Sequence, residues 1–208
     1  MLTASKGLKA ALVALMLPLL ATVPAAALDL TNAAYVQTNT GYTSIPVGHA
    51  QFCKARPDEC RRNDNPVAAV TLDDGRWSQL LEVNAYFNST IVPVSDRELY
   101  QIDEFWTYPN GYGDCEDYAL AKRRALIEAG WPASTLLMAV VREPNGEGHA
   151  VLLVRTDRGD LVLDNQEGLI RLWSETPYQF LKRQDQVDAS RWVEMIDDRS
   201  ITITASAD

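Results

Sequence analysis

The sequence predicts an α+β fold, because helical patterns come first along the chain and strand patterns follow. Two segments, residues 77–91 and 115–129, carry apolar residues every three or four positions, which is typical of amphipathic helices. From residue 136 onward the pattern changes to short runs rich in β-branched and apolar residues, separated by turn residues. Helices followed by an antiparallel sheet are an α+β arrangement.

The length and composition are those of one globular domain. The 208 residues leave room for a single domain at roughly 150 residues per domain. A hydrophobic content of 47% and a charged content of 23% exclude disordered and collagen-like chains. The net charge of −9 argues against a nucleic-acid partner, because phosphate contacts need a basic surface.

The first 27 residues have the layout of a secretory signal peptide. Lys6 and Lys9 form a positive region, an apolar run follows at residues 10–20, and the small residues 25–27 form an A-x-A cleavage site. An uncleaved membrane anchor is the alternative, although the run is short for a bilayer span. Cleavage removes two lysines and no acid, so the net charge changes from −9 to −11. Residues 28–208 are then expected to fold as one domain in the periplasm or outside the cell, where disulfides persist.

The three cysteines leave at least one thiol free in an oxidising compartment. Cys53 and Cys60 lie in residues 28–70, an N-terminal extension of the domain, and a disulfide between them would close a loop of about eight residues. A zinc site is the competing interpretation, but no second pair of cysteines or histidines matches it. The neighbouring His49 is expected to lie on the surface or in the packing, and Cys115 stays free.

Capping residues mark the ends of the two predicted helices. Residues 73–75, Asp-Asp-Gly, supply capping chemistry before the helix at residues 77–91. The helix at residues 115–129 follows Asp114, a good N-cap residue, and ends before Gly130, where a C-terminal glycine stop belongs.

A loop and a set of strands complete the predicted elements. Residues 100–113, rich in glycine, proline and aromatic residues, are expected to form a shaped loop. In it, Trp106 and Tyr108 either line a substrate groove or anchor the loop in the core. A hairpin turn is expected over residues 157–160. The predicted strands span residues 136–142, 149–155, 161–164 and 169–173, with edge strands at 192–196 and 201–204.

Cys115 is the first candidate for chemistry. Residues 113–118, Gly-Asp-Cys-Glu-Asp-Tyr, deliver it to the first turn of a helix, where partial positive charge and free N–H groups favour the nucleophilic thiolate. Its own N–H group can donate to an oxyanion. A buried structural cysteine is the alternative. Further along this helix, Lys122, Arg123 and Arg124 are predicted to form a solvated face.

His149 and Asp164 are the candidates for a general base and its orienting acid. His149 opens a predicted strand directly after a glycine-bearing turn, which gives an imidazole both rigidity and access. Asp164 ends the next strand, and in a hairpin the end of the second strand lies beside the start of the first. The two side chains are therefore expected to face each other. The alternatives are structural: a histidine at a strand end and an acid that caps a turn.

Three blocks of sequence, GDCEDYALAK, GHAVLLV and LVLDN, carry Cys115, His149 and Asp164 in the order of papain-like and transglutaminase-like enzymes. They resemble the bacterial transglutaminase-like cysteine peptidases, the family of the LapG-type periplasmic proteases. The resemblance spans residues 77–173. Further similarities lie at Asn84, Asn88 and residues 103–106.

The resemblance implies a papain/transglutaminase-like fold, in which a nucleophile at a helix N-terminus packs on the antiparallel sheet. It implies Cys115 as nucleophile, His149 as general base and Asp164 as orienting acid of a cysteine endopeptidase. Its substrate would be a protein such as a surface adhesin, and its regulator a membrane receptor. A transglutaminase or amidase would use the same triad, and a calcium-binding module with an idle active site is a further alternative. The segment of Cys53 and Cys60 lies outside the family pattern, and we expect a monomer.

The resemblance also implies a calcium requirement, with Asp114 and Glu116 as ligands. The residues support a cation independently, because three carboxylates lie within two positions of Cys115. Their charge raises the pKa of the thiol and opposes the nucleophile. A hard divalent cation would cancel that effect. The alternative is that the acids cap the helix and face water.

Overall fold

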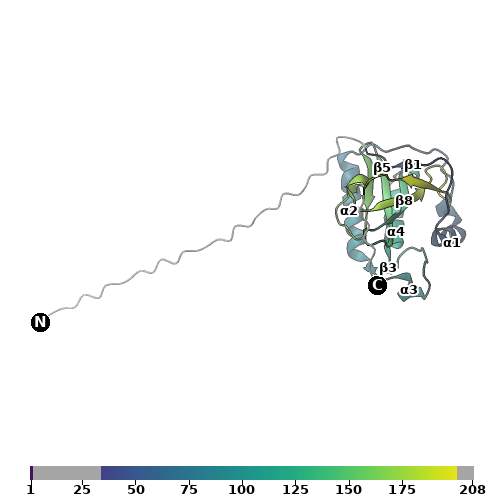
Figure 1. Cartoon of the computed structure of the whole chain (residues 1–208). Coiled ribbons are helices and arrows are strands. Elements are labelled where there is room, and N and C mark those ends of the chain that lie inside the picture. Colours follow the sequence, from purple (N-terminus) through teal and green to yellow (C-terminus); the bar gives the residue numbers. More distant parts are fainter. Residues whose placement is uncertain (2–33, 201–208) are drawn as a thin grey trace.

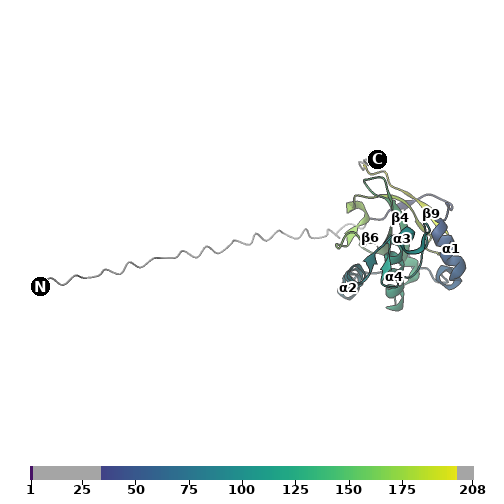
Figure 2. The same ribbon diagram turned by 90° about the horizontal axis from the view of Figure 1, so that it is seen from below.

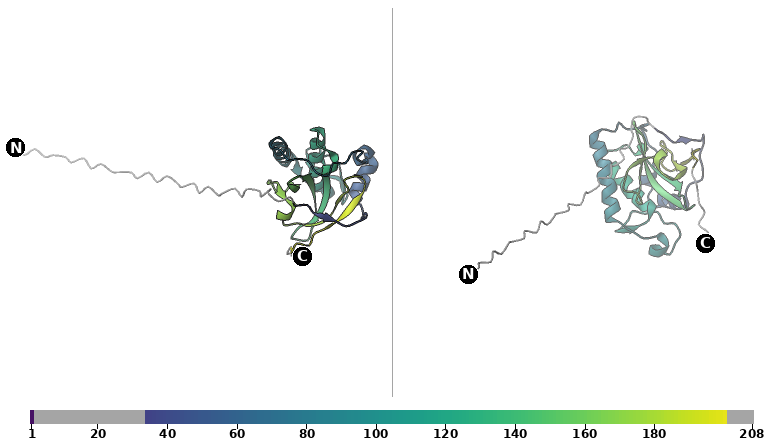
Figure 3. Two further views of the ribbon diagram at one scale, coloured as in Figure 1. Left: turned by 90° about the horizontal axis from the view of Figure 1, so that it is seen from above. Right: turned by 60° about the vertical axis from the view of Figure 1, so that its left-hand side comes forward.

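A row of helices covers one face of a seven-stranded sheet in the computed structural model, which describes Met1 and residues 34–200. Helices α2 (Asp74–Thr90), α4 (Cys115–Glu128) and α1 (Val47–Ala55) lie side by side with α4 in the middle (Figures 2 and 3). The predicted α+β class is therefore confirmed. Within the described ranges, no helix has the length and hydrophobicity that a membrane span requires.

The sheet is antiparallel throughout its described part, with the strand order β1-β9-β8-β4-β5-β6-β7. A separate parallel pair joins β2 (Val92–Pro93) to β3 (Tyr112–Gly113). The strands of the large sheet are β1 (Gln37–Thr38), β4 (Leu136–Arg142), β5 (Gly148–Thr156), β6 (Gly159–Leu163), β7 (Arg171–Leu172), β8 (Gln179–Gln184) and β9 (Trp192–Ile196).

Most predicted elements are present, and one central strand was missed. The bounds of β4 and β9 agree with the predictions, and the predicted hairpin turn joins β5 to β6. Strand β8 was not predicted, because its sequence QFLKRQ contains too many polar residues to resemble a buried strand. It nevertheless lies between β9 and β4 in the sheet. The predicted strand at residues 201–204 and the predicted signal peptide lie outside residues 34–200.

The helix ends follow from capping chemistry. The Asp73 carboxylate accepts a hydrogen bond from the Arg76 N–H group at 2.8 Å and caps α2 as predicted. Gly130 follows α4 with a φ of 89°, a left-handed conformation that glycine adopts without strain. Helix α1 was not predicted, because its sequence VGHAQFCKA is too polar to indicate the face that is buried in the structure.

Two hydrophobic cores lie on the two faces of the sheet. The larger core lies between the helices and the sheet and includes Leu80 of α2, Leu126 of α4 and Leu152 of β5. The second core covers the other face of the sheet and includes Val151 of β5 and Phe180 of β8. Because α4 lies between α2, α1 and the sheet, nine of its residues are buried, which fixes its position against β4 and β5.

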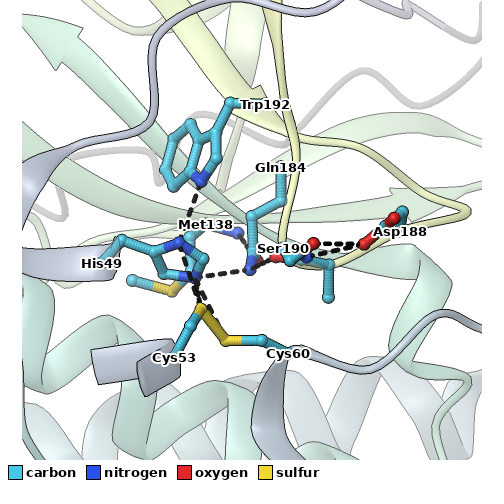
Figure 4. Close-up of a disulfide and its surroundings, with 9 residues drawn as sticks. His49, Cys53, Cys60, Met138, Gln184, Asp188, Ser190 and Trp192 are labelled. Atoms are coloured by element: carbon cyan, nitrogen blue, oxygen red, sulfur yellow. Dashed lines mark hydrogen bonds between the residues drawn. A yellow bond between two sulfur atoms is a disulfide. The ribbon is translucent and has the colours of Figure 1, made fainter. Parts of the chain in front are cut away.

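The Cys53–Cys60 disulfide, predicted from the sequence, fastens α1 to the following 3₁₀ turn (Figure 4). The two sulfur atoms lie 3.6 and 3.9 Å from the ring of His49, which is buried. Burial and the charge of a nearby arginine lower the pKa of His49 to about 4. Its Nδ1 accepts a hydrogen bond from the Trp192 indole, and its Nε2 lies 3.0 Å from the Gln184 amide. With both sulfur atoms in the disulfide, these contacts form a packed clip.

Removing the disulfide tests how much the clip stabilises the fold. The double variant Cys53→Ala/Cys60→Ala is expected to lose about 2.5 kcal/mol of unfolding free energy in urea titrations, because the unfolded chain gains the entropy of an open loop of about eight residues. A reducing agent should destabilise the wild type and the matched control Cys115→Ala equally, and should leave the double variant unchanged. A double variant as stable as the oxidised wild type would contradict this role.

Candidate active site

Cys115 lies in a cleft of about 420 Å³ between the N-terminus of α4 and the helix-covered face of the sheet. The cleft is formed by α1, the loop before α4, and strands β4, β5 and β8. Trp106 has both of the roles that the sequence allows, because it is buried and also lines the cleft. The lining residues are Pro46, Val47, Glu104, Trp106, Cys115, Glu116, Val140, Gly148, His149, Ala150 and Lys182.

The Cys115 thiol contacts both the sheet and its own helix. Its Sγ atom accepts a hydrogen bond from the Ala150 N–H group of β5 at 3.4 Å and donates to the Glu116 carboxylate at 3.1 Å. Burial raises the pKa of the thiol well above its ordinary value, and the negative charge of Glu116 raises it further. The acids beside Cys115 therefore oppose thiolate formation, as their spacing predicts.

His149 and Asp164 face each other as the hairpin prediction requires. His149 is the second residue of β5, and Asp164 is the first residue after β6, its antiparallel neighbour. The His149 Nε2 atom lies 2.9 Å from the Asp164 Oδ1 atom, and both side chains are buried. The second ring nitrogen, Nδ1, lies 3.8 Å from the carboxylate of Glu143. The ring is thus fixed in the cleft that contains Cys115.

Two residues that sequence reasoning missed hold the Asp164 carboxylate. The Tyr178 hydroxyl donates to its Oδ2 atom at 2.5 Å, and the Gln166 N–H group donates to its Oδ1 atom at 3.0 Å. Burial opposes ionisation of Asp164, but the hydrogen bond and charge of His149, with the two further donors, outweigh burial and lower its pKa. The Tyr178 ring also lies 5.5 Å from the His149 ring, between centroids. Neither residue belongs to a recognisable motif.

Behind the cleft, three carboxylates form a cluster that could hold a cation. Ligand oxygens of Asp96, Asp114 and Glu116 all lie within 4.8 Å of one another. Asp96 was missed, because it lies on the separate short helix α3 (Asp96–Tyr100), which lies near β3 (Figure 1). Asp114 occupies the N-cap position as predicted, but its carboxylate makes no capping bond and accepts the Asp96 N–H group at 3.0 Å.

The donor set of this cluster fits a hard cation. Oδ1 of Asp96 and Oδ1 of Asp114 are buried and have no hydrogen-bond partner within residues 34–200. Burial and the charge of Asp114 raise the pKa of Glu116 to about 9. Calcium binds carboxylate oxygens of this kind. Asp117 lies outside the cluster: it accepts the Thr107 N–H group at 2.9 Å and supports the loop before the helix.

The basic residues of α4 do not form the solvated face that the sequence suggested. Lys122 is completely buried, and its Nζ atom lies 6.0 Å from the Tyr118 ring. Burial lowers the pKa of Lys122 to about 7. Arg123 is also buried and donates to the Leu136 carbonyl oxygen. Arg124 alone among the three is exposed. The prediction was wrong because packing partners surround α4, which the spacing of charges along one helix does not reveal.

The α+β fold, with Cys115 and His149 in one cleft and Asp164 hydrogen-bonded to His149, defines the class of thiol hydrolases with a transglutaminase-like arrangement. Residues 39–200 match the family described as bacterial transglutaminase-like cysteine proteinase (BTLCP), and the chain belongs to this family. The family resemblance seen in the sequence is thereby confirmed.

Solved structures of LapG from Legionella pneumophila are similar to this chain. The calcium-bound form shares 27% identity over 52% of this chain and 65% of that chain, with a TM-score of 0.47. The EGTA-treated form shares 26% identity over 60% of this chain and 69% of that chain, with a TM-score of 0.48. The match thus spans less than two thirds of the calcium-bound chain. No curated protein matches significantly.

Tyr178→Phe tests the support of Asp164. The variant is expected to lose about 1.5–3 kcal/mol of unfolding free energy at pH 7, the value of a hydrogen bond to a charged group. Because the pKa of Asp164 is lowered by folding, its ionised contacts stabilise the fold above the unfolded pKa of about 3.9 and are lost as the pH falls through the folded pKa. In urea titrations, the loss of unfolding free energy in the variant should therefore be smaller at pH 3 than at pH 7.

The matched control is Tyr118→Phe, which removes a buried hydroxyl that donates to the neutral Ile91 carbonyl oxygen at 2.6 Å. Tyr118→Phe should lose the same amount of unfolding free energy at pH 7 and at pH 3. An equally constant deficit for Tyr178→Phe would show that the hydroxyl does not stabilise an ionised Asp164.

Proposed function

We propose that this chain is a cysteine endopeptidase whose triad is Cys115, His149 and Asp164. One observation carries the proposal: His149, hydrogen-bonded to Asp164, lines the same cleft as a cysteine at a helix N-terminus. Membership of a cysteine proteinase family supports it. The idle-module alternative is disfavoured, because the set of nucleophile, base and orienting acid is complete.

The chemistry of these three residues suggests the following order of catalytic steps. His149 takes the proton of Cys115, and the thiolate attacks the carbonyl carbon of the scissile peptide bond. N–H groups at the start of α4, including that of Cys115, stabilise the oxyanion. His149 then protonates the leaving amine as the peptide C–N bond breaks, which leaves the acyl group on Cys115 as a thioester. Afterwards it removes a proton from a water molecule, which hydrolyses the thioester and releases Cys115. Asp164 holds the Nε2–H tautomer of His149, so that Nδ1 carries the proton in each transfer.

Calcium is part of the proposal, with Asp96, Asp114 and Glu116 as its ligands. The support is the close approach of three carboxylates and the two buried oxygens that lack donors among the described residues. When bound, the ion would supply positive charge beside Cys115 and offset the effect of the acids on the thiol. The calcium-bound and EGTA-treated forms of LapG are consistent with a cation in this family.

The location and the substrate are proposed from the sequence. A cleavable signal peptide and the Cys53–Cys60 disulfide agree with a periplasmic or secreted protein. The substrate is proposed to be a protein of the cell surface, such as an adhesin, and a membrane receptor is proposed as the regulator. Transamidation by the same triad is an outcome that the first experiment below separates from hydrolysis.

The first experiment tests the triad. Incubation of wild-type protein with surface proteins of the source organism should create new N-termini, and Cys115→Ala should create none while its melting temperature stays that of the wild type. Iodoacetamide should alkylate Cys115 selectively near neutral pH, more slowly in His149→Ala. New N-termini that also form with Cys115→Ala would contradict the triad, and incorporation of a free amine without cleavage would indicate a transamidase.

The second experiment tests the cation. At a calcium concentration 100-fold above its dissociation constant, a single site stabilises the fold by about 2.7 kcal/mol. Chelation with EGTA should therefore lower the melting temperature by about 5–10 °C and suppress peptide cleavage. Asp96→Asn should reproduce both losses, whereas Asp58→Asn, which changes an exposed acid outside the cluster, should respond to calcium like the wild type. Unchanged melting and cleavage after thorough chelation would refute the calcium site.

A further inference from the structure

The charges that line the cleft are divided between its two sides. Glu104 and Glu116 lie on the side of the α4 N-terminus, next to the carboxylate cluster. Lys182 of β8 lies on the other side and is the only lysine or arginine among the lining residues. A substrate in this cleft therefore meets negative charge at one end and positive charge at the other.

The Lys182 ammonium group has neutral partners. Its Nζ atom donates to the Ser44 carbonyl oxygen at 2.9 Å and to the Ser44 hydroxyl at 3.0 Å. Glu194 faces it across the β8–β9 pair, but the Glu194 carboxylate accepts a hydrogen bond from Asn39 at 2.6 Å. No described carboxylate forms an ion pair with Lys182. An ammonium group has three donors, so one donor and the full charge stay available to a ligand.

The sheet fixes the separation between Lys182 and the catalytic strand. Lys182 pairs with Val140 of β4, which pairs with Ala150 of β5, and all three line the cleft. Two strand spacings make this separation about 10 Å. An extended peptide advances about 3.3 Å per residue, so the span corresponds to two or three residues.

We infer that Lys182 is a specificity-determining residue that selects an acidic side chain two or three residues from the scissile bond. The inference rests on the proposed function and specifies its substrate class: protein segments with Asp or Glu at this distance on one side of the cleavage site. A basic residue at the same position is disfavoured by repulsion from the ammonium group. On the opposite side, Glu104 disfavours an acid in the same way.

The test is a cleavage-site profile with a proteome-derived peptide library, read from the new N-termini that wild-type protein creates and Cys115→Ala does not. Asp and Glu should be enriched two or three residues from the cut, on one side. Synthetic peptides with Asp, Asn or Lys at that position should then differ in kcat/KM by about five-fold per step, the size of a partly exposed ion pair.

Charge reversal separates recognition from a structural role. Lys182→Glu should prefer the Lys peptide over the Asp peptide, and Lys182→Gln should lose the preference. Ser44→Ala weakens the anchoring of Lys182 but keeps its charge, so the preference for Asp should persist. Lys54→Glu, which changes an exposed lysine of α1 that does not line the cleft, should behave like the wild type.

The outcomes distinguish this inference from the function on which it rests. Cysteine-dependent cleavage without a charge preference, or a preference that Lys182→Glu does not reverse, overturns the inference and leaves the peptidase intact. An absence of cleavage that depends on Cys115 overturns the proposed function and the inference with it.

Discussion

The burial of α4 is the constraint on which the rest of the structure depends. This helix packs between two other helices and the sheet, so that its first turn has one position relative to β5. The hydrogen bond from the Ala150 N–H group to the Cys115 sulfur joins the two elements at that point. Because His149 precedes Ala150 in the same strand, fixing the helix against β5 also sets the nucleophile and the base in one cleft.

The same packing brings titratable groups into places where water cannot stabilise them. The buried titratable groups in and near α4 include Lys122, Asp164 and Glu116. Asp164 compensates for burial with three hydrogen-bond donors, and its pKa is lowered. Glu116 has no comparable set of donors, and its pKa is raised. Both carboxylates are buried, so the opposite directions of their pKa shifts follow from their different partners.

Features that depend on neighbouring residues in sequence could be predicted. The start of α2 after Asp73, the bounds of β4 and the approach of His149 to Asp164 follow from capping, periodicity and a hairpin. Features that depend on distant segments could not be predicted. Asp96 joins Asp114 from another helix, and Tyr178 reaches Asp164 from the segment before the unpredicted strand β8. The sequence predicts an exposed Lys122, because it does not show the helices that pack against α4 and bury this residue.

The sizes of the electrostatic effects around Cys115 decide how its thiolate could form. The partial charge of a helix N-terminus stabilises an anion by about 0.3–1 kcal/mol, and by about 2 kcal/mol where it is partly buried. Taking a single ion out of water costs several kcal/mol, and the neighbouring Glu116 and Asp114 raise the pKa of the thiol further. The helix N-terminus is therefore too weak to offset the three carboxylates of Asp96, Asp114 and Glu116. The proposed function therefore includes a divalent cation at this cluster, whose positive charge would offset its carboxylates.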